Sequence, residues 1–117
     1  MTALAIARPG RATLICPLSD LVPGCGIAAR CADGQVAIFY LPDELQRVYA
    51  IGNLDPMSGA AVLARGIVGD KAGELVVASP IYKHHYSLFT GRCLEEEAVS
   101  VPVYRALISD SHLYLVR

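Results

Sequence analysis

A run of strand-forming residues at positions 35–41 constrains the fold of this chain more than any other feature. The run follows Asp33-Gly34, a dipeptide typical of the tight turn in a β-hairpin. Side chains alternate between the two faces of a strand, and both faces are apolar here: Val36, Ile38 and Tyr40 on one, Ala37, Phe39 and Leu41 on the other. This pattern predicts a central strand that is covered on both sides.

Further short strand signals follow at 47–51, 75–78, 86–89, 99–105 and 113–116, separated by turns rich in Gly, Pro, Asp and Ser, such as 69–73. Pro102 cannot donate to a ladder, so the strand at 99–105 should be an edge strand or carry a bulge. Helix signals are limited to one turn at 19–21 and a short piece within 58–65. The sequence therefore predicts an all-β sandwich or barrel.

The length of 117 residues fits one domain over residues 1–117, with 1–11 expected to be poorly ordered. The 54% apolar content has two explanations: a sheet buried on both faces, or a surface that a partner covers. No apolar run approaches the roughly 20 residues that cross a bilayer, and residues 1–7 lack the basic start of a secretory signal. We expect a cytoplasmic protein that does not bind membranes.

Charge and cysteine content narrow the function classes further. The net charge is −1, and the basic residues are scattered, which argues against binding to nucleic acid. The one acidic run, residues 95–97, is interpreted as a solvated turn. The four cysteines (Cys16, Cys25, Cys31 and Cys93) contain no Cys-x-x-Cys pair, and we expect buried free thiols.

Two loops each follow a strand-like apolar run, the first at 52–60 and the second at 78–91. In a Rieske domain such loops carry Cys-x-His and Cys-x-x-His, which give two thiolates to one iron and two imidazoles to the other. Those four positions fall here on Asn53, Asp55, Ser79 and Tyr82. We expect that side-chain hydrogen bonds hold the loops together where metal bonds would otherwise do so.

Other candidate chemistry is weak in this sequence. His84 and His85 are adjacent, so on a strand they would point to opposite faces rather than at one ion, and His112 is distant. A single carboxylate at Asp55 is a poor cage for Mg²⁺ or Ca²⁺. A Cys–His dyad of Cys93 with either histidine stays open, and no Gly-x-Ser-x-Gly elbow or phosphate-binding loop occurs. We therefore expect no independent catalytic site, no bound cofactor and no metal.

From about Cys16 to its end, the chain resembles a known family, the small subunits of assimilatory NAD(P)H-dependent nitrite reductases. The resemblance rests on residues 20–29, 35–39, 63–70 and 90–94 and on two more distinctive segments, YAIGNLDPMSGA at 49–60 and VVASPIYKHHY at 76–86. It implies a Rieske-like fold with two cluster-loop-like hairpins and without the cluster ligands. It also implies an accessory role beside a large subunit that carries FAD, a 4Fe-4S cluster and siroheme and reduces nitrite to ammonium.

The resemblance further suggests that the loops form the partner interface, since that end of a Rieske protein faces its electron partner. The candidate interface residues are Asn53, Asp55, Met57, Ser79, Tyr82, Lys83, His84 and His85. Two alternatives remain: a stand-alone Rieske-type electron carrier, which conflicts with the four replaced ligands, and a small β-barrel metal enzyme that uses His84, His85 and Asp55.

Overall fold

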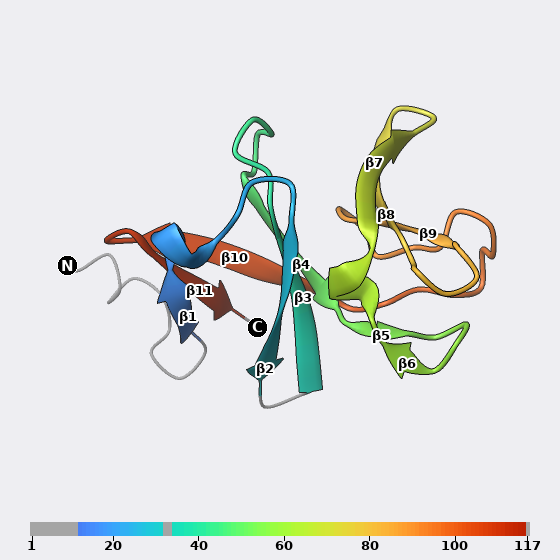
Figure 1. Cartoon of the computed structure of the whole chain (residues 1–117), viewed down its shortest axis with the longest axis horizontal. Coiled ribbons are helices and arrows are strands. Elements are labelled where there is room, and N and C mark those ends of the chain that lie inside the picture. The colour runs from blue at the N-terminus through green and yellow to red at the C-terminus, as the bar shows by residue number, and fades with distance from the viewer. Residues whose placement is uncertain (1–11, 32–33, 117) are drawn as a thin grey trace.

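In the computed structural model, which describes residues 12–31 and 34–116, the largest unit is a barrel-like sheet of six strands. All its pairings are antiparallel, in the order β1-β11-β10-β4-β3-β2 (Figure 1). The strands are β1 (Ala12–Pro17), β2 (Gly26–Cys31), β3 (Gly34–Tyr40), β4 (Val48–Gly52), β10 (Val103–Ser109) and β11 (His112–Val116). The expectation of an all-β fold is confirmed.

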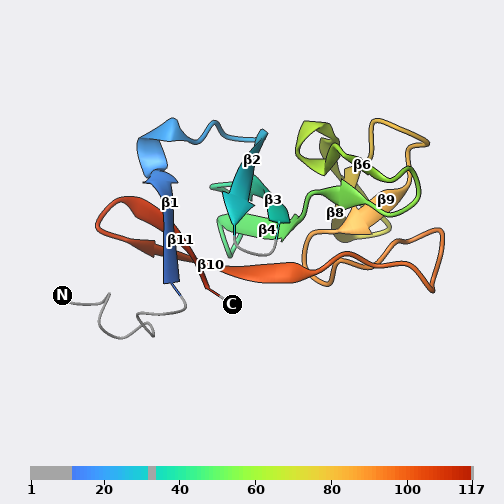
Figure 2. The same ribbon diagram turned by 90° about the horizontal axis from the view of Figure 1, so that it is seen from below.

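The middle of the chain builds a second unit beside this sheet. Strands β7 (Ile67–Lys71), β8 (Glu74–Ala78) and β9 (His85–Ser87) form a three-stranded antiparallel sheet. A two-stranded ribbon joins β5 (Leu54–Asp55) to β6 (Ala60–Ala61), and the short 3₁₀ helix η2 (Leu63–Arg65) leads from it into β7. Figure 2 shows this unit at the opposite end of the molecule from β1 and β11, with β3 and β4 between them.

Strand β3 lies between two apolar cores, because its alternate faces pack in opposite directions. Val36 and Ile38 are fully buried and pack with Leu113 of β11 inside the barrel-like sheet. Ala37 and Phe39, also fully buried, belong to the core of the second unit. Since β4 flanks β3 on one side and β2 on the other, the prediction of a central strand covered on both faces is confirmed.

The strand expected at 99–105 is displaced. Strand β10 begins at Val103, after Pro102. The segment before it, residues 99–101, instead pairs in antiparallel fashion with residues 91–93. There the Val101 amide donates to the Gly91 carbonyl over 2.8 Å, and the Cys93 amide donates to the Val99 carbonyl over 3.0 Å. Because Pro102 has no N–H, the ladder with β4 starts only at Val103.

Several local expectations are corrected. Residues 69–71, expected in a turn, belong to β7, and the turn itself is Ala72-Gly73, both at positive φ. The piece expected to be helical at 58–65 contains β6 and η2, whereas the turn expected at 19–21 corresponds to η1 (Leu18–Asp20). The four cysteines are free, but only Cys93 is buried, and Cys25 is exposed. Asp33 and residues 1–11 lie outside the described residues.

Among the described residues, no helix has the length and apolar character needed to span a bilayer.

Candidate functional site

The two loops meet at the end of the second unit. The first loop leaves β4, runs through β5 and turns at Gly59, whose amide donates to the Asp55 carbonyl over 2.7 Å with φ at +77°. The second loop leaves β8 at Ala78 and returns as β9. In Figures 1 and 2 the two loops lie side by side. A direct hydrogen bond between Ser79 and Asp55 joins them.

Asp55 is the centre of this junction. Its side chain is fully buried and accepts four hydrogen bonds. Oδ1 accepts from the Met57 amide at 2.9 Å and the Tyr86 hydroxyl at 2.7 Å, and Oδ2 accepts from the hydroxyls of Ser58 at 3.1 Å and Ser79 at 2.6 Å. Burial raises the pKa of the carboxyl, but these bonds outweigh it, so the net pKa lies below its usual range. We call Asp55, Ser58, Ser79 and Tyr86 the Asp55 cluster.

The two donors from the second loop are fixed by their own surroundings. The Ser79 hydroxyl also accepts from the Ile81 amide at 3.2 Å, and the Ser79 amide donates to the His84 carbonyl at 2.9 Å. Tyr86, on β9, is completely buried in the apolar core. Burial, together with the hydrogen bond to Asp55 and its negative charge, raises the pKa of Tyr86 well above the usual range. The phenol therefore stays protonated and acts as a donor to Asp55.

Asn53 is buried but does not join the Asp55 cluster. Its Oδ1 accepts from the Ala64 amide at 2.7 Å, and its Nδ2 donates to the Gln35 side chain at 2.9 Å and the Ala61 carbonyl at 3.2 Å. The Asn53 side chain therefore ties the first loop to η2 and to the start of β3. Of the four Rieske ligand positions, only Asp55 and Ser79 bond to each other.

Tyr82, the fourth of those positions, makes no hydrogen bond to the Asp55 cluster. The backbone at Tyr82 and Lys83 has φ of 62° and 60°, a region that residues other than glycine seldom adopt. The Tyr82 side chain is 69% exposed. Next to it, His84 Nδ1 is buried without a hydrogen-bond partner. Met57, in the first loop, is half-buried.

His85 takes part in a separate polar group on the flank of this end. Its Nδ1 lies 2.6 Å from Oε2 of Glu95, which also accepts from Lys71 Nζ at 2.8 Å. Glu95 Oε1 accepts from the His85 amide at 2.8 Å. Partial burial raises the pKa of Glu95, yet the bonds from His85 and Lys71 prevail and lower it to about 2. Residues 95–97 are exposed, as expected of a solvated turn, and Glu95 in addition takes part in ion pairs.

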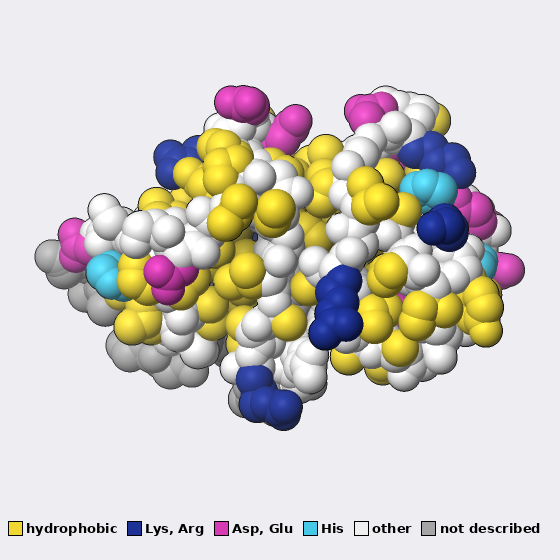
Figure 3. Space-filling view, in the orientation of Figure 1, with side chains coloured by type: hydrophobic (Ala, Val, Ile, Leu, Met, Phe, Trp, Pro, Cys, Tyr) yellow, Lys and Arg dark blue, Asp and Glu magenta, His cyan; other side chains and the backbone are white. Residues whose placement is uncertain are grey.

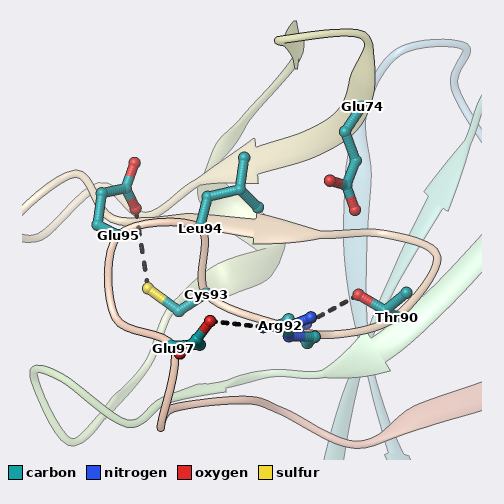
Figure 4. A pocket seen from close by; sticks show the side chains of 7 residues that line it. All are labelled: Glu74, Thr90, Arg92, Cys93, Leu94, Glu95 and Glu97. Carbon is teal, nitrogen blue, oxygen red and sulfur yellow. Dashed lines mark hydrogen bonds and ion pairs between the residues drawn. The ribbon is translucent and has the colours of Figure 1, made fainter.

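Cys93 lies beside Glu95 in a cavity of about 360 Å³ that three glutamates line (Figure 4). The full lining is Glu74, Thr90, Arg92, Cys93, Leu94, Glu95 and Glu97. The Cys93 thiol is 2% exposed and lies 3.8 Å from Glu95 Oε1, toward which it donates. The hydrogen bond of this thiol is therefore made to a carboxylate and not to a histidine ring. The geometry gives the Cys–His dyad no support.

The loop residues do not fit a 2Fe-2S cluster of the Rieske type. Such a cluster takes thiolate and imidazole ligands, and the four positions offer an amide, a carboxylate, a hydroxyl and a phenol. Both Asp55 oxygens and the Ser79 hydroxyl are already engaged in hydrogen bonds, and the Tyr82 side chain is exposed. Across residues 12–31 and 34–116, no three His, Cys, Asp or Glu side chains gather as a metal site.

Sequence reasoning missed Ser58, Tyr86 and Glu95. Tyr86 lies 31 positions from Asp55, and it reads in the sequence as one more apolar strand residue. Ser58 follows Asp55 by three positions, a spacing at which a turn hydroxyl can reach back to a carboxylate. That spacing was the one usable signal.

Comparison with known proteins identifies the family. A family model described as a Rieske-like 2Fe-2S domain matches residues 12–116. The small subunit of nitrite reductase (NADH) from Salmonella typhimurium is 43% identical over 101 residues, which cover 86% of this chain and 93% of that protein. The solution structure of the Escherichia coli protein NirD is 39% identical, has a TM-score of 0.78, and is matched over 89% of this chain and 96% of that one.

A segment of the nitrite reductase (NAD(P)H) large subunit from Klebsiella oxytoca is also similar. It is 44% identical over 86 residues, covering 74% of this chain and 8% of that protein. The match to the family model and the identity to nitrite reductase small subunits over nearly their full length agree with the fold and with the loop geometry. The chain belongs to the Rieske-like domain family, in the group formed by the small subunits of nitrite reductase.

Proposed function

We propose that this chain is the accessory, non-catalytic small subunit of a cytoplasmic, assimilatory NAD(P)H-dependent nitrite reductase, and that it binds a large subunit through its loop end. In this proposal residues 1–117 act as one domain. The large subunit carries FAD, a 4Fe-4S cluster and siroheme and reduces nitrite to ammonium. The small subunit itself binds neither nucleic acid nor membranes.

The observation that carries the proposal is that the same domain occurs in two arrangements. It matches 93% of a separate small subunit and also 8% of the length of a large subunit. A domain that is found both as a separate chain and within the large polypeptide is expected to work in contact with the rest of that polypeptide. This favours a stable association over a role as a free electron carrier.

The local chemistry supports a non-catalytic role. The buried carboxylate accepts four hydrogen bonds, and its hydroxyl donors point at it rather than at a substrate. A general base needs a free lone pair within reach of a proton on the substrate, and Asp55 has no exposed surface from which to offer one. Its place in the molecule is that of a structural anchor for the two loops.

The candidate interface residues then divide into two groups. Asn53, Asp55 and Ser79 are buried, so they support the interface from beneath by fixing the loops. Tyr82 and Lys83 are exposed, and they offer contact surface directly. Met57, His84 and His85 are half-buried at the margins.

Co-purification tests the proposal. The tagged chain is purified from its host under gentle conditions, and the eluate is examined for flavin and siroheme absorbance. We expect a large protein with both cofactors to come with it. Recovery of a colourless chain alone would contradict the association, and stoichiometric iron and sulfide on the isolated chain would instead support an electron carrier.

A further inference from the structure

The loop end has an exposed surface of apolar and basic side chains, which we call the tip face. It consists of Leu54, Arg65, Ile67, Tyr82 and Lys83. Leu54, Ile67 and Tyr82 are 55%, 76% and 69% exposed, although large apolar side chains usually avoid water. Leu54 adjoins Asp55, Ile67 pairs with Ala78 next to Ser79, and the Leu63 amide before Arg65 donates to the Asn53 carbonyl. Thus all five surround the junction between the loops.

The exposed formal charges of the tip face are all positive. Between positions 52 and 68 and between 78 and 91, Asp55 is the sole acidic residue, and it is fully buried. Arg65 and Lys83 are exposed, and neither forms an ion pair with any described residue. In Figure 3 this half of the molecule shows dark-blue groups among yellow ones, with magenta groups toward its margins. This local charge contrasts with the net charge of −1 for the whole chain.

The second loop is held in a conformation that is unfavourable in the free chain. Two consecutive residues other than glycine, Tyr82 and Lys83, have positive φ, and His84 Nδ1 is buried without a partner. Such conformations persist where the surrounding structure imposes them, and they concentrate at functional sites. Here the conformation turns a tyrosine and a lysine outward together. Tyrosine is enriched among the residues that dominate binding energy at interfaces.

We propose that the tip face binds an apolar patch rimmed by carboxylates on the large subunit. Tyr82 inserts into the patch, and Lys83 and Arg65 pair with acidic side chains at its rim. This inference rests on the proposed function and adds the chemistry of the partner surface. Charge complementarity carries it, because two exposed cations that form no ion pair with any described residue select an anionic partner.

The test measures the affinity of this chain for the separated large subunit, at low and at high NaCl. Tyr82→Ala should weaken binding at least tenfold at both salt concentrations, mainly by faster dissociation. Arg65→Glu and Lys83→Glu should weaken it mainly at low salt, because rim charges act through long-range attraction that salt screens. Binding by the unsubstituted chain should weaken as salt rises.

Leu45→Ala and Arg105→Glu serve as matched controls. Leu45 is fully exposed in the connection between β3 and β4, and Arg105 is an exposed cation on β10, so both lie outside the tip face. They should bind as the unsubstituted chain does, and circular dichroism should show every variant folded. If the tip-face variants bind like the controls, the inference and the placement of the interface at the loop end are overturned, while the association with the large subunit stands. If the unsubstituted chain does not bind, the proposed function itself fails.

Discussion

The barrel-like sheet and the loop end of this molecule are stabilised in different ways. In the sheet, Val36, Ile38 and Leu113 have no exposed surface and pack against other apolar groups. At the loop end, one buried carboxylate gathers four donors from both loops. Apolar packing tolerates changes of pH, whereas a hydrogen-bonded charge does not. The comparison suggests that the sheet sets whether the chain folds, and that the Asp55 cluster sets how the loops are presented.

The largest expected effect comes from removing the centre of the Asp55 cluster. Asp55→Ala leaves three hydroxyls and the Met57 amide without their acceptor, and each unsatisfied group carries a penalty, so we expect a loss of about 4 kcal/mol. Leu113→Ala in the sheet should cost a similar 2–5 kcal/mol, roughly, through a cavity. Urea unfolding followed by circular dichroism measures both. A loss below about 1 kcal/mol for Asp55→Ala would remove the cluster from its structural role.

The second largest effect is expected in acid, where the stability contributed by the Asp55 cluster should fall and that contributed by the sheet should not. The pKa of Asp55 is lower in the folded chain than in the unfolded chain, so its contribution is complete above the unfolded pKa of about 3.9 and is lost as pH falls through the folded value. Unfolding at pH values between about 5 and 2 should therefore show a steep loss of stability. Asp55→Asn should flatten that loss, while Leu113→Ala should leave its slope unchanged. If stability fell equally steeply with pH in the unsubstituted chain, Asp55→Asn and Leu113→Ala, the assignment of this loss to Asp55 would be contradicted.

A smaller effect is expected when only one hydrogen-bond donor to Asp55 is removed. Tyr86→Phe removes the 2.7 Å bond to Asp55 and leaves the ring in the core, so we expect a loss of about 2 kcal/mol. Because burial and Asp55 raise the pKa of Tyr86, one tyrosine should resist alkaline titration until the chain unfolds, and this variant should lack it. Tyr82→Phe is the control, since that ring is exposed, and its stability should not change.

The smallest effect is expected on the flank. Glu95→Gln weakens an ion-pair group whose members are partly exposed to solvent, and such pairs contribute about 0–1 kcal/mol. The loss should shrink further in high salt. Glu96→Gln, an exposed neighbour, provides the baseline. A loss at Glu95 as large as that at Asp55 would show that the flank, rather than the junction, holds this end together.

The fold could be predicted from the sequence where the pattern was dense. An unbroken run of strand-forming residues predicts strand β3, and its burial on both sides follows from the apolar residues on both faces. Strand β2 contains a glycine and two alanines, which are weak strand formers, and it becomes a strand because it pairs with β3 over six positions. Local pattern cannot show a pairing of that kind.

The candidate site was predictable only in part. The resemblance of the two loops to those of a Rieske domain placed Asp55 and Ser79 at ligand positions expected to meet, and the structure joins them directly. The exposure of Tyr82 could not be foreseen, because positive φ at Tyr82 and Lys83 occurs without a glycine to signal it. Tyr86 could not be foreseen either, since its partner lies on a different strand pair of the fold.

The Asp55 cluster also bears on how the chain matures in the cell. All of its donors and its acceptor are groups that the polypeptide carries when it leaves the ribosome. The two loops can therefore close as the chain folds, with no step of iron delivery and no sensitivity of the junction to oxygen. The closure of this junction therefore does not depend on the iron supply of the cell.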